Sequence, residues 1–454
     1  MPLRVICHGG ACEIGGNKIL IEDKDTKVLL DFGAGFSEGI EYFSAGIKPR
    51  TVNGAGDYFE FGLLPEIEGL YSEDALANTS IKYVRPEVDA VFVSHFHLDH
   101  TSRIEFVDPD IPVYCGETTK LIHEAYDTFG TSPLRAKKKL LTFRTGSKLK
   151  IGNLEVVPIH VDHSIPGAYG FLIFSSAGTI VYTGDFRFHG PQGSMTEQFL
   201  EEAVRTRPLA LISEGTRVST QDTRRQMSEA DVVSMTCDVL ESCKKFVFSS
   251  FRGNDIDRIN SFYKACMRAQ RTFVVSTKTA VLLEKLKRDS HLHVPEPAKD
   301  VEVYVRRKKS GKFDDRDYSV WERKYLDVGL TCEEIRKKQE RLFLHLDIWN
   351  LPEMIDIKPE PGGAYIHSSS EAFNEEGEEE EEVVRNWVSH FGFSYNQIHA
   401  SGHASAFEVE GLVRNISAQK VIPIHTDHPE LFASFKNLKG KVVAPKKGVE
   451  IHVA

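Results

Sequence analysis

The sequence predicts an α/β protein in which a layered sheet unit is interrupted by a second α/β unit. The first part of the chain alternates short runs of Val, Ile and aromatic residues with turns marked by Gly and Asp, which is typical of a layered sheet. From about residue 205 the apolar runs alternate with helical patterns, which is typical of a parallel sheet. Near its end the chain returns to the first pattern. We therefore expect one sheet unit from residues 1–205 and 383–454, with an inserted unit over residues 206–382.

The individual elements follow from local hydrophobic periodicity. In the first unit the expected strands are LRVIC (3–7), NKILIED (17–23), KVLLDFG (27–33), VDAVFVSH (88–95), IPVYC (111–115), LEVVPIHV (154–161), YGFLIF (169–174) and TIVYTGDF (179–186). In the second unit we expect buried parallel strands at LALISEG (209–215), KFVFSS (245–250) and TFVVSTKT (272–279), with helices over 228–245 and 255–270. The acidic run at 375–382 is predicted to open a helix, because acidic side chains suit a helix N-terminus and an apolar stripe follows.

Composition and cysteine usage exclude several classes of protein. Seven scattered cysteines with no CxxC pair indicate neither a disulfide framework nor a thiolate zinc site, so a reducing cytoplasm is expected. The uncharged run at 164–184 is long enough to consider as a membrane span, but Pro166, Ser175, Ser176 and Gly178 interrupt it. We interpret the run as two short strands and predict no membrane segment.

The net charge of −10 argues against a protein that holds nucleic acid by bulk electrostatics. A polyanionic substrate would then have to be attracted by local cationic clusters or by bound cations. Basic clusters occur at 135–139, 306–309 and 336–338, although solvated helix faces are the simpler interpretation of each.

The stretch VSHFHLDH at residues 93–100 is a candidate metal site. In an extended chain His95 and His97 point the same way, so both imidazoles could meet one ion. Asp99 and His100 follow in the turn and could face a second ion, since zinc accepts both imidazole nitrogen and carboxylate oxygen. The alternative is a histidine-rich loop with ordinary hydrogen bonds.

Three further clusters of potential metal ligands stand at strand ends. They are His160, Asp162 and His163 in VPIHVDHSIPG, Asp185 in IVYTGDFRFHG, and His425, Asp427 and His428 in VIPIHTDHP. Any one of them alone is more often a satisfied polar group than a ligand. Together they could complete two metal shells.

The motifs VLLDFG, HFHLDH, DHSIPG and YTGDF resemble those of the metallo-β-lactamase superfamily, whose hydrolases bind two metals at one edge of an αββα sandwich. ISEGT, ASGHAS and PIHTD resemble the three motifs of the β-CASP nucleases, in which an α/β domain is inserted into that sandwich. Within the group the last two motifs are most similar to ribonuclease J, and SHFHLDH is also similar to the cleavage subunit of the polyadenylation machinery. Because ribonuclease J usually carries a further C-terminal domain, we expect a minimal two-domain form.

The resemblance assigns a role to each matching residue. It implies two zinc ions, although manganese or another divalent ion would also fit the donors. The first ion would be held by His95, His97 and His163, the second by Asp99, His100 and His425, with Asp185 bridging the two. Asp31 would position the metal loop, and Glu214 would support catalysis through His403. His160 and His428 are the less favoured alternatives to His163 and His425.

The resemblance also implies RNA as the substrate, because a histidine at position 425 matches the RNA-acting members of the group. We expect single-stranded RNA with a 5′-monophosphate, contacted by residues of FSSFRGND and ASGHAS: Ser249, Ser250, Arg252, Asn254, Ser401, Gly402, His403 and Ser405. The Ser-rich PGGAYIHSSS, with His367, is a weaker candidate. The alternative is that these residues only shape turns.

The expected function is a two-metal ribonuclease that acts from 5′ to 3′ as an exonuclease and also cuts internally. One alternative is an endonuclease of the RNA 3′-end processing type. A second alternative, from another class, is a non-catalytic RNA-binding subunit with the same fold. A homodimer is compatible with the sequence, which indicates no membrane association.

Overall fold

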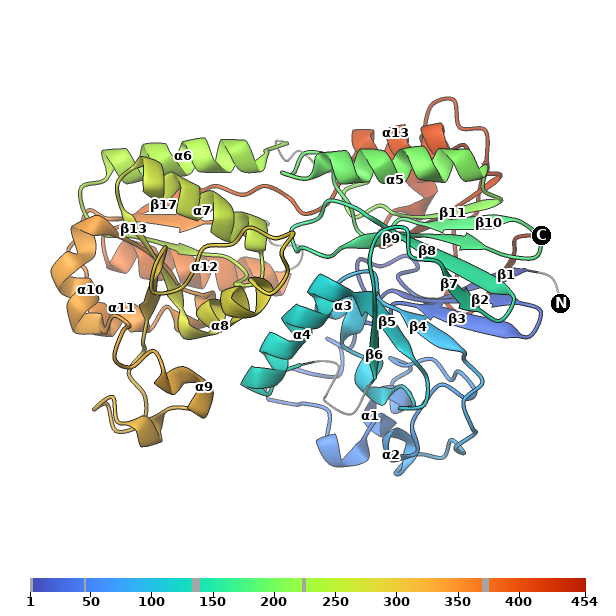
Figure 1. The fold of residues 1–454 in the computed structure, drawn as a ribbon, viewed down its shortest axis with the longest axis horizontal. Helices are drawn as coiled ribbons and strands as arrows, with labels where there is room; N and C mark the ends of the chain where they lie inside the picture. The colour runs from blue at the N-terminus through green and yellow to red at the C-terminus, as the bar shows by residue number, and fades with distance from the viewer. Residues whose placement is uncertain (1–2, 45, 133–138, 223–225, 370–374) are drawn as a thin grey trace.

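Two seven-stranded sheets lie face to face and form one apolar core between them, shown on the right of Figure 1. This computed structural model describes residues 3–44, 46–132, 139–222, 226–369 and 375–454. The first sheet has the order β20 (Glu450–His452), β1 (Arg4–Gly9), β2 (Lys18–Asp23), β3 (Thr26–Leu30), β4 (Ala90–Phe92), β5 (Val113–Gly116), β6 (Leu140–Phe143). The second has the order β19 (Lys441–Val442), β18 (Lys420–Ile424), β11 (Ala210–Glu214), β10 (Thr179–Tyr182), β9 (Tyr169–Phe174), β8 (Leu154–His160), β7 (Leu149–Ile151).

Apolar side chains from both sheets alternate into this core, as the period-two pattern of the strands predicts. Val5 and Phe92 of the first sheet belong to the same buried cluster as Phe171, Tyr182 and Ile212 of the second. The expected hairpin within 164–184 is confirmed, because β9 and β10 pair antiparallel. No helix among the described residues is long and apolar enough to span a membrane.

Helices cover the outer face of each sheet. The first sheet is covered by the segment that contains α1 (Gly56–Glu60) and α2 (Glu73–Leu76), and the second by α5 (Gly193–Thr206) and α13 (Ala406–Ile416). The α13 helix begins with a capping box, in which Ser405 and Glu408 satisfy each other's backbone N–H groups. The result is a four-layered helix–sheet–sheet–helix sandwich, which confirms the predicted architecture.

A third sheet of six parallel strands forms a separate lobe, on the left of Figure 1. Its order is β14 (Glu302–Tyr304), β13 (Thr272–Ser276), β15 (Leu342–His345), β12 (Val247–Ser250), β16 (Ala364–His367), β17 (Ser394–Gln397). One face is covered by α6 (Glu229–Ser242), α7 (Ile256–Arg268) and α8 (Thr277–Leu286). The other is covered by α10 (Cys332–Lys338), α11 (Glu353–Ile357) and α12 (Glu375–His390).

The domain bounds derived from the sequence stay a prediction, and the strand pairings refine where they would fall. Strand β11 lies in the sandwich, where it pairs in parallel with β10 and β18. The sequence pattern of its LALISEG segment had instead placed it in the inserted unit. Strand β17 is the edge of the third sheet. These pairings favour an inserted unit that runs from α6 to β17 rather than over 206–382. The expected helix at the acidic run is confirmed by α12, whose Val384 and Val388 are buried.

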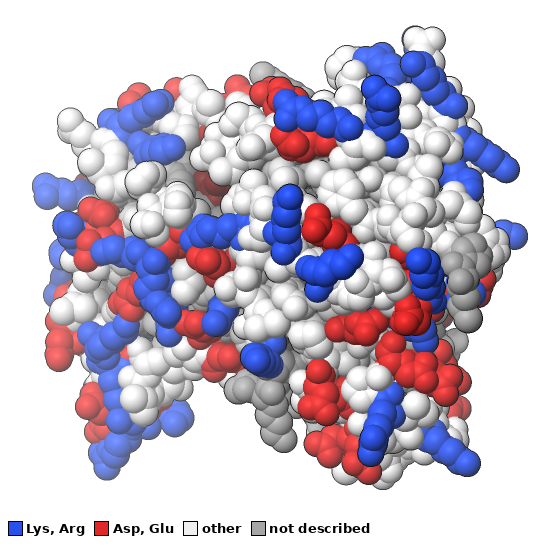
Figure 2. Space-filling view, turned by 45° about the vertical axis from the view of Figure 1, so that its right-hand side comes forward, with Lys and Arg blue, Asp and Glu red and all other residues white. Residues whose placement is uncertain are grey.

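The basic clusters are paired locally rather than gathered into one cationic surface. Arg307 bonds to Glu333 and Lys308 to Glu322, while Arg336 donates to backbone carbonyls. Basic and acidic side chains are interspersed over the face shown in Figure 2. The cluster at 135–139 lies outside the described residues except for Lys139. The 306–309 cluster lies in an irregular segment after β14 rather than on a helix, whereas the 336–338 cluster lies on α10, so among the described residues the helix-face interpretation fits the 336–338 cluster.

A buried ionic network joins the two lobes behind the sandwich edge. Arg187, which follows β10, pairs with Asp162 of the sandwich and with Asp257 on α7. Arg258, also on α7, pairs with Glu229 of α6 at 3.0 Å, and both Arg187 and Arg258 have fully buried side chains. Helix α4 (Glu117–Phe129) of the sandwich adds an apolar contact, because Leu121, Ile122 and Ala125 join the core of the third sheet.

Removing one partner of this network should destabilise the inserted lobe. In Arg258→Met, the Glu229 carboxylate would stay buried without its guanidinium, and breaking a buried pair costs about 3–5 kcal/mol. We expect a clearly lower thermal midpoint by calorimetry. Arg205→Met, which breaks an exposed pair with Glu202 on α5, is the matched control and should change the midpoint little. Equal midpoints for the two variants would contradict the assignment.

Candidate metal centre and active site

Five strands of the sandwich end at the same edge, and the segments that follow them carry the predicted metal ligands. The ligands are His95, His97, Asp99 and His100 after β4, His163 after β8, Asp185 after β10 and His425 after β18. The fifth strand, β11, ends at Glu214, which was predicted to support catalysis rather than to bind metal. A short helix, α3 (Leu98–Thr101), turns Asp99 and His100 back toward the edge. Residues as far apart in sequence as Asp31 and His425 thereby reach one buried cluster.

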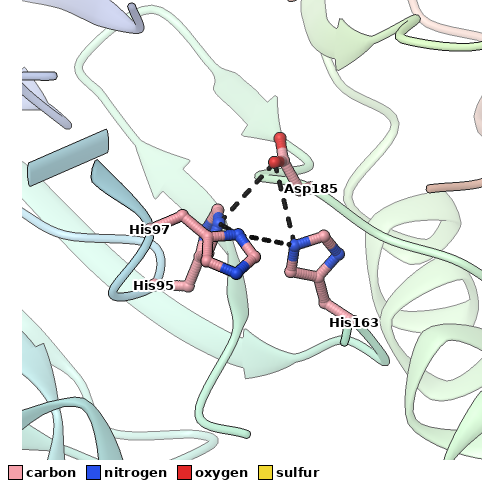
Figure 3. A group of neighbouring side chains, drawn as sticks. All are labelled: His95, His97, His163 and Asp185. Carbon is pink, nitrogen blue, oxygen red and sulfur yellow. Dashed lines mark hydrogen bonds and ion pairs between the residues drawn. The ribbon is translucent and has the colours of Figure 1, made fainter. Parts of the chain in front are cut away.

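The first predicted group, His95, His97, His163 and Asp185, comes together as Figure 3 shows. His97 Nδ1 lies 3.0 Å from His95 Nε2 and 3.1 Å from His163 Nε2. Asp185 Oδ2 lies 3.6 Å from His95 Nε2 and 4.0 Å from His163 Nε2. Three ring nitrogens and one carboxylate oxygen that converge in this way match a tetrahedral donor set.

The second predicted group, Asp99, His100, Asp185 and His425, lies beside the first and shares Asp185 with it. His425 Nε2 is 3.0 Å from Asp99 Oδ2, and His100 Nε2 is 3.1 Å from Asp185 Oδ2. All four side chains are buried. The other oxygen of Asp185, Oδ1, is buried and has no hydrogen-bond partner among the described residues. The Asp185 carboxylate therefore faces both donor groups through Oδ2 and keeps Oδ1 without a protein partner among the described residues.

Asp31 organises this cluster from behind. Its carboxylate accepts hydrogen bonds from Ser94 N at 2.7 Å, Ser94 Oγ at 2.8 Å and Tyr182 Oη at 2.5 Å. The same carboxylate lies 2.8 Å from His100 Nδ1, which leaves His100 Nε2 to face Asp185. Asp31 has a positive φ of 54°, a conformation that costs energy and is retained where the surroundings hold it. The position matches a residue that orients a ligand.

The outer nitrogens of two other histidines are also fixed. His163 Nδ1 lies 2.6 Å from the carbonyl oxygen of Gly402, and His425 Nδ1 lies 2.8 Å from Thr216 Oγ1. A hydrogen bond to the outer nitrogen selects the tautomer and leaves the inner nitrogen free to bind a cation. His425 also has a positive φ, of 52°.

The electrostatics differ between the two halves of the cluster. Burial lowers the pKa of His97 to about 3 and holds the pKa values of His95 and His163 well below their usual range. Neutral imidazole is the form that binds metal. In the second group, burial also opposes protonation of His425. The Asp185 and Asp99 carboxylates outweigh this effect and raise the pKa of His425 to about 9. The carboxylates therefore favour positive charge at this point.

Glu214 and His403 form a pair next to the cluster. His403 Nδ1 lies 3.1 Å from Glu214 Oε2 and 3.9 Å from Asp185 Oδ2. Glu214 is fully buried and also accepts a hydrogen bond from the backbone N–H of Phe186 at 2.8 Å. The His403 side chain is 21% exposed, so this imidazole is held on one side and open on the other. A histidine in this position can exchange a proton with a bound molecule.

A cleft opens over the metal-binding cluster and is lined by both lobes. Of the predicted substrate-binding residues, it contains Arg252, Asn254, Ser401, Gly402 and His403. Arg252 is exposed, and its guanidinium lies over the Phe36 ring at 5.8 Å. The Ser401 hydroxyl accepts the backbone N–H of His403, which shapes the turn.

The remaining predicted substrate contacts lie away from this opening. Ser249 and Ser250 are fully buried in β12, and Ser250 bonds to Tyr365. Ser405 is the N-cap of α13. His367 is buried and stacks on Tyr395. Their burial and capping favour the structural alternative, in which these residues shape the fold.

Sequence reasoning missed several residues of the site. Phe36 and His399 line the cleft, and Thr216 contacts Glu214, His403 and His425. Ser368 and Ser369 of the weaker candidate PGGAYIHSSS also line the cleft. Thr216 could have been suspected from its place two residues after Glu214. Phe36 carries no local signal that distinguishes it from other loop aromatics. The less favoured ligands are separate from the cluster, since His160 stacks on Tyr169 and His428 is near Glu430.

The donor set fits a pair of divalent cations. Each predicted group offers four ligand atoms within 4.8 Å of one another, and the shared carboxylate has a buried oxygen without a partner. Imidazole and carboxylate donors suit zinc and also manganese.

Comparison with known proteins agrees with this geometry. Residues 72–240 match the model of the Beta-lactamase superfamily domain. The chain is 22% identical to Ribonuclease J of Helicobacter pylori over 92% of its own length and 55% of that protein, and 22% identical to Ribonuclease J 2 of Streptococcus pyogenes over 96% and 71%. It thus spans about half the length of the Helicobacter relative. The crystal structure of a protein of unknown function from Enterococcus faecalis matches with a TM-score of 0.77 at 22% identity, covering 99% of this chain and 100% of that one.

These matches confirm the predicted metallo-β-lactamase fold, and over most of its length the chain is similar to proteins named Ribonuclease J.

A metal-binding experiment tests the shared carboxylate. We expect the purified protein to hold two equivalents of Zn²⁺ or Mn²⁺, and Asp185→Asn to weaken binding at both positions, because a neutral amide replaces the charge common to both groups. Equilibrium dialysis with elemental analysis would measure this. Asp427→Asn is the matched control, since Asp427 is exposed and lies outside both groups. Two equivalents bound with unchanged affinity in Asp185→Asn would contradict the bridging role.

Proposed function

We propose that this chain is a divalent-metal-dependent ribonuclease that hydrolyses phosphodiester bonds in RNA. The observation that carries the proposal is that two donor groups share Asp185 and stand next to the His403–Glu214 pair in a single cleft. The similarity to proteins named Ribonuclease J supports RNA as the substrate class.

The chemistry needs an activated water and compensation of the charge that develops on phosphorus. Two divalent cations, held by His95, His97, His163, Asp99, His100, His425 and the shared Asp185, would supply Lewis acidity and lower the pKa of water toward about 7. The chain's own residues orient these donors through Asp31, Thr216 and the Gly402 carbonyl. Burial of the cluster keeps bulk water from weakening these interactions.

His403 is the residue we assign to proton transfer. Its Nδ1 donates to Glu214, so its Nε2 is the nitrogen left to interact with a scissile phosphate or to protonate the leaving oxygen. The buried Glu214 carboxylate accepts this hydrogen bond and holds the orientation of the imidazole. Asp99, predicted as both ligand and catalytic residue, would act through its place in the second donor group.

The walls of the cleft match a nucleic-acid strand. Arg252 and Asn254 on one side can bind phosphate oxygens, and the half-exposed Phe36 ring on the other can stack with a base. They arise from different lobes but lie beside each other, with the Arg252 guanidinium 5.8 Å from the Phe36 ring, so one strand that runs past this pair could contact both side chains.

The finer activity we propose is 5′-to-3′ degradation of single-stranded RNA with a 5′-monophosphate, together with internal cleavage. An endonuclease of the 3′-end processing type is the competing activity, and cleavage of a circular RNA would reveal it. A non-catalytic RNA-binding role is less favoured, because all seven predicted ligands converge. Zinc as the resident ion, a cytoplasmic location and a homodimer stay predictions.

The state of the RNA 5′ end tests the exonuclease proposal. We expect 5′-monophosphorylated RNA to be degraded processively to mononucleotides, and the same RNA with a 5′-triphosphate to persist, because the proposed activity requires a site for a 5′-monophosphate, which would exclude three phosphates. Gel analysis of labelled RNA with each 5′ end would measure this. His97→Ala and Asp99→Ala should both be inactive. Equal degradation of all 5′ ends would overturn the exonuclease assignment, and activity in both variants would overturn the metal assignment.

Substitution of His403 separates chemistry from binding. We expect His403→Ala to lower kcat by about 10²–10⁴-fold with little change in KM, because a general acid acts mainly in the transition state. Steady-state kinetics on a short labelled RNA would give both constants. His428→Ala is the matched control, since that half-exposed histidine lies outside the cluster. A rise in KM with an unchanged kcat would show that His403 only binds RNA.

A further inference from the structure

One hydroxyl group connects the two functional parts of the site. Thr216 Oγ1 lies 2.6 Å from Glu214 Oε2, 3.1 Å from His403 Nδ1 and 2.8 Å from His425 Nδ1. Glu214 and His403 belong to the proposed proton-transfer pair, whereas His425 belongs to the second donor group. We infer that Thr216 is a positioning residue that couples the proposed metal ligand to this pair, an inference that rests on the proposed function.

The numbers of donors and acceptors determine which hydrogen bonds the Thr216 hydroxyl donates and which it accepts. A hydroxyl has one hydrogen to donate and two lone pairs to accept, and an ionised carboxylate can only accept. Thr216 therefore donates to Glu214 at 2.6 Å and accepts from His425 Nδ1 at 2.8 Å. This assignment of hydrogens puts the proton of His425 on Nδ1. Nε2 is then the nitrogen that faces Asp99 Oδ2, 3.0 Å away, and a cation that replaced its proton would be bound between the two.

The second lone pair of the hydroxyl faces His403 Nδ1, which also donates to Glu214. The same oxygen therefore fixes the tautomer of His425 and supports the orientation of His403. Removing it would leave His425 Nδ1 without this acceptor and Glu214 without its shortest bond. Both changes would result from the loss of the same atom, Thr216 Oγ1.

Backbone geometry holds Thr216 in this place. It follows the end of β11, and a hydrogen bond from Val218 N to Gly215 O at 2.9 Å closes the turn. Gly215 allows the turn to pack closely, since a Cβ there would lie 2.7 Å from the Phe432 ring. Thr216 itself is 8% exposed. The hydroxyl is thus positioned by the fold rather than selected from a mobile loop.

The test compares Thr216→Val, which keeps the shape and removes the hydroxyl, with Thr216→Ser, which keeps the hydroxyl. The first readout is the affinity for Zn²⁺ alone, measured in competition with a chromogenic chelator. The second is kcat and KM on 5′-monophosphorylated RNA. Thr236→Val is the matched control, because Thr236 is fully buried and its hydroxyl has no hydrogen-bond partner among the described residues.

We expect Thr216→Val to bind the more weakly held Zn²⁺ about 10–100-fold less tightly, the range typical of lost contacts behind a metal ligand. Its kcat should fall while KM changes little, and Thr216→Ser should restore both quantities to within about threefold of the original protein. The thermal midpoints of Thr216→Val and Thr236→Val should be similar. If Thr216→Val does not fold, Thr216→Ala carries the same expectation.

Zn²⁺ affinity in Thr216→Val equal to that of the original protein would overturn the inference, as would Thr216→Ser being impaired as strongly as Thr216→Val. If the original protein degrades RNA, neither of these two outcomes would contradict the proposed function. Conversely, an original protein that binds Zn²⁺ but does not cleave RNA would refute the proposed function, while the affinity comparison would still decide whether Thr216 positions His425.

Discussion

The buried carboxylate of Asp185 is the constraint around which the site is arranged. Its Oδ2 lies between 3.1 and 4.0 Å from a ring nitrogen of each of His95, His100, His163, His403 and His425. A carboxylate in such a place costs several kcal/mol unless positive charge accompanies it. The five histidines come from four separate segments, so the carboxylate can be compensated only when both sheets of the sandwich and the segment that returns from the inserted lobe meet at one edge.

That requirement explains why strain and buried charge gather there. Asp31 and His425 both adopt positive φ values at the ends of strands, where an extended or helical continuation would turn their side chains away from the cluster. Arg187, two residues after Asp185, binds Asp162 beside His163, the carbonyl of Ser401 beside Gly402, and Asp257 of the other lobe. The same ionic network that joins the lobes therefore also fixes two segments of the cluster.

Sequence alone predicted most strands of the sandwich and its interruption, because each depends on a local pattern or on a motif, and it proposed ligand positions that the structure brings together. Strands β6, β7, β14, β15, β16 and β17 were not among the expected ones. His95 and His97 follow an apolar strand, and the place of His163 before Ser-Ile-Pro distinguished it from His160. The prediction was weaker where a role depends on the direction of a side chain. Ser249 and Ser250 carry the right chemistry but are buried in β12, and Phe36 reaches the cleft only because Gly15 and Gly35 pair and bring its loop beside Asp99. Such placements follow from tertiary packing, which no local pattern records.

Thr216 shows why a chain with a net charge of −10 can still be suited to a polyanion. Asp99, Asp185 and Glu214 are each hydrogen-bonded to a histidine, and Asp255, which also lines the cleft, accepts a hydrogen bond from the backbone N–H of Arg258. The hydroxyl of Thr216 contacts Glu214, His403 and His425, so it connects the carboxylate of the proton-transfer pair to the donor group that would hold a cation. Unpaired, these carboxylates would repel a phosphate. In this arrangement they would instead help to hold cations, and the cations would attract the phosphate. The net charge of the chain therefore does not predict whether it can bind a polyanion. The pairing of each carboxylate near the cleft is the more informative property.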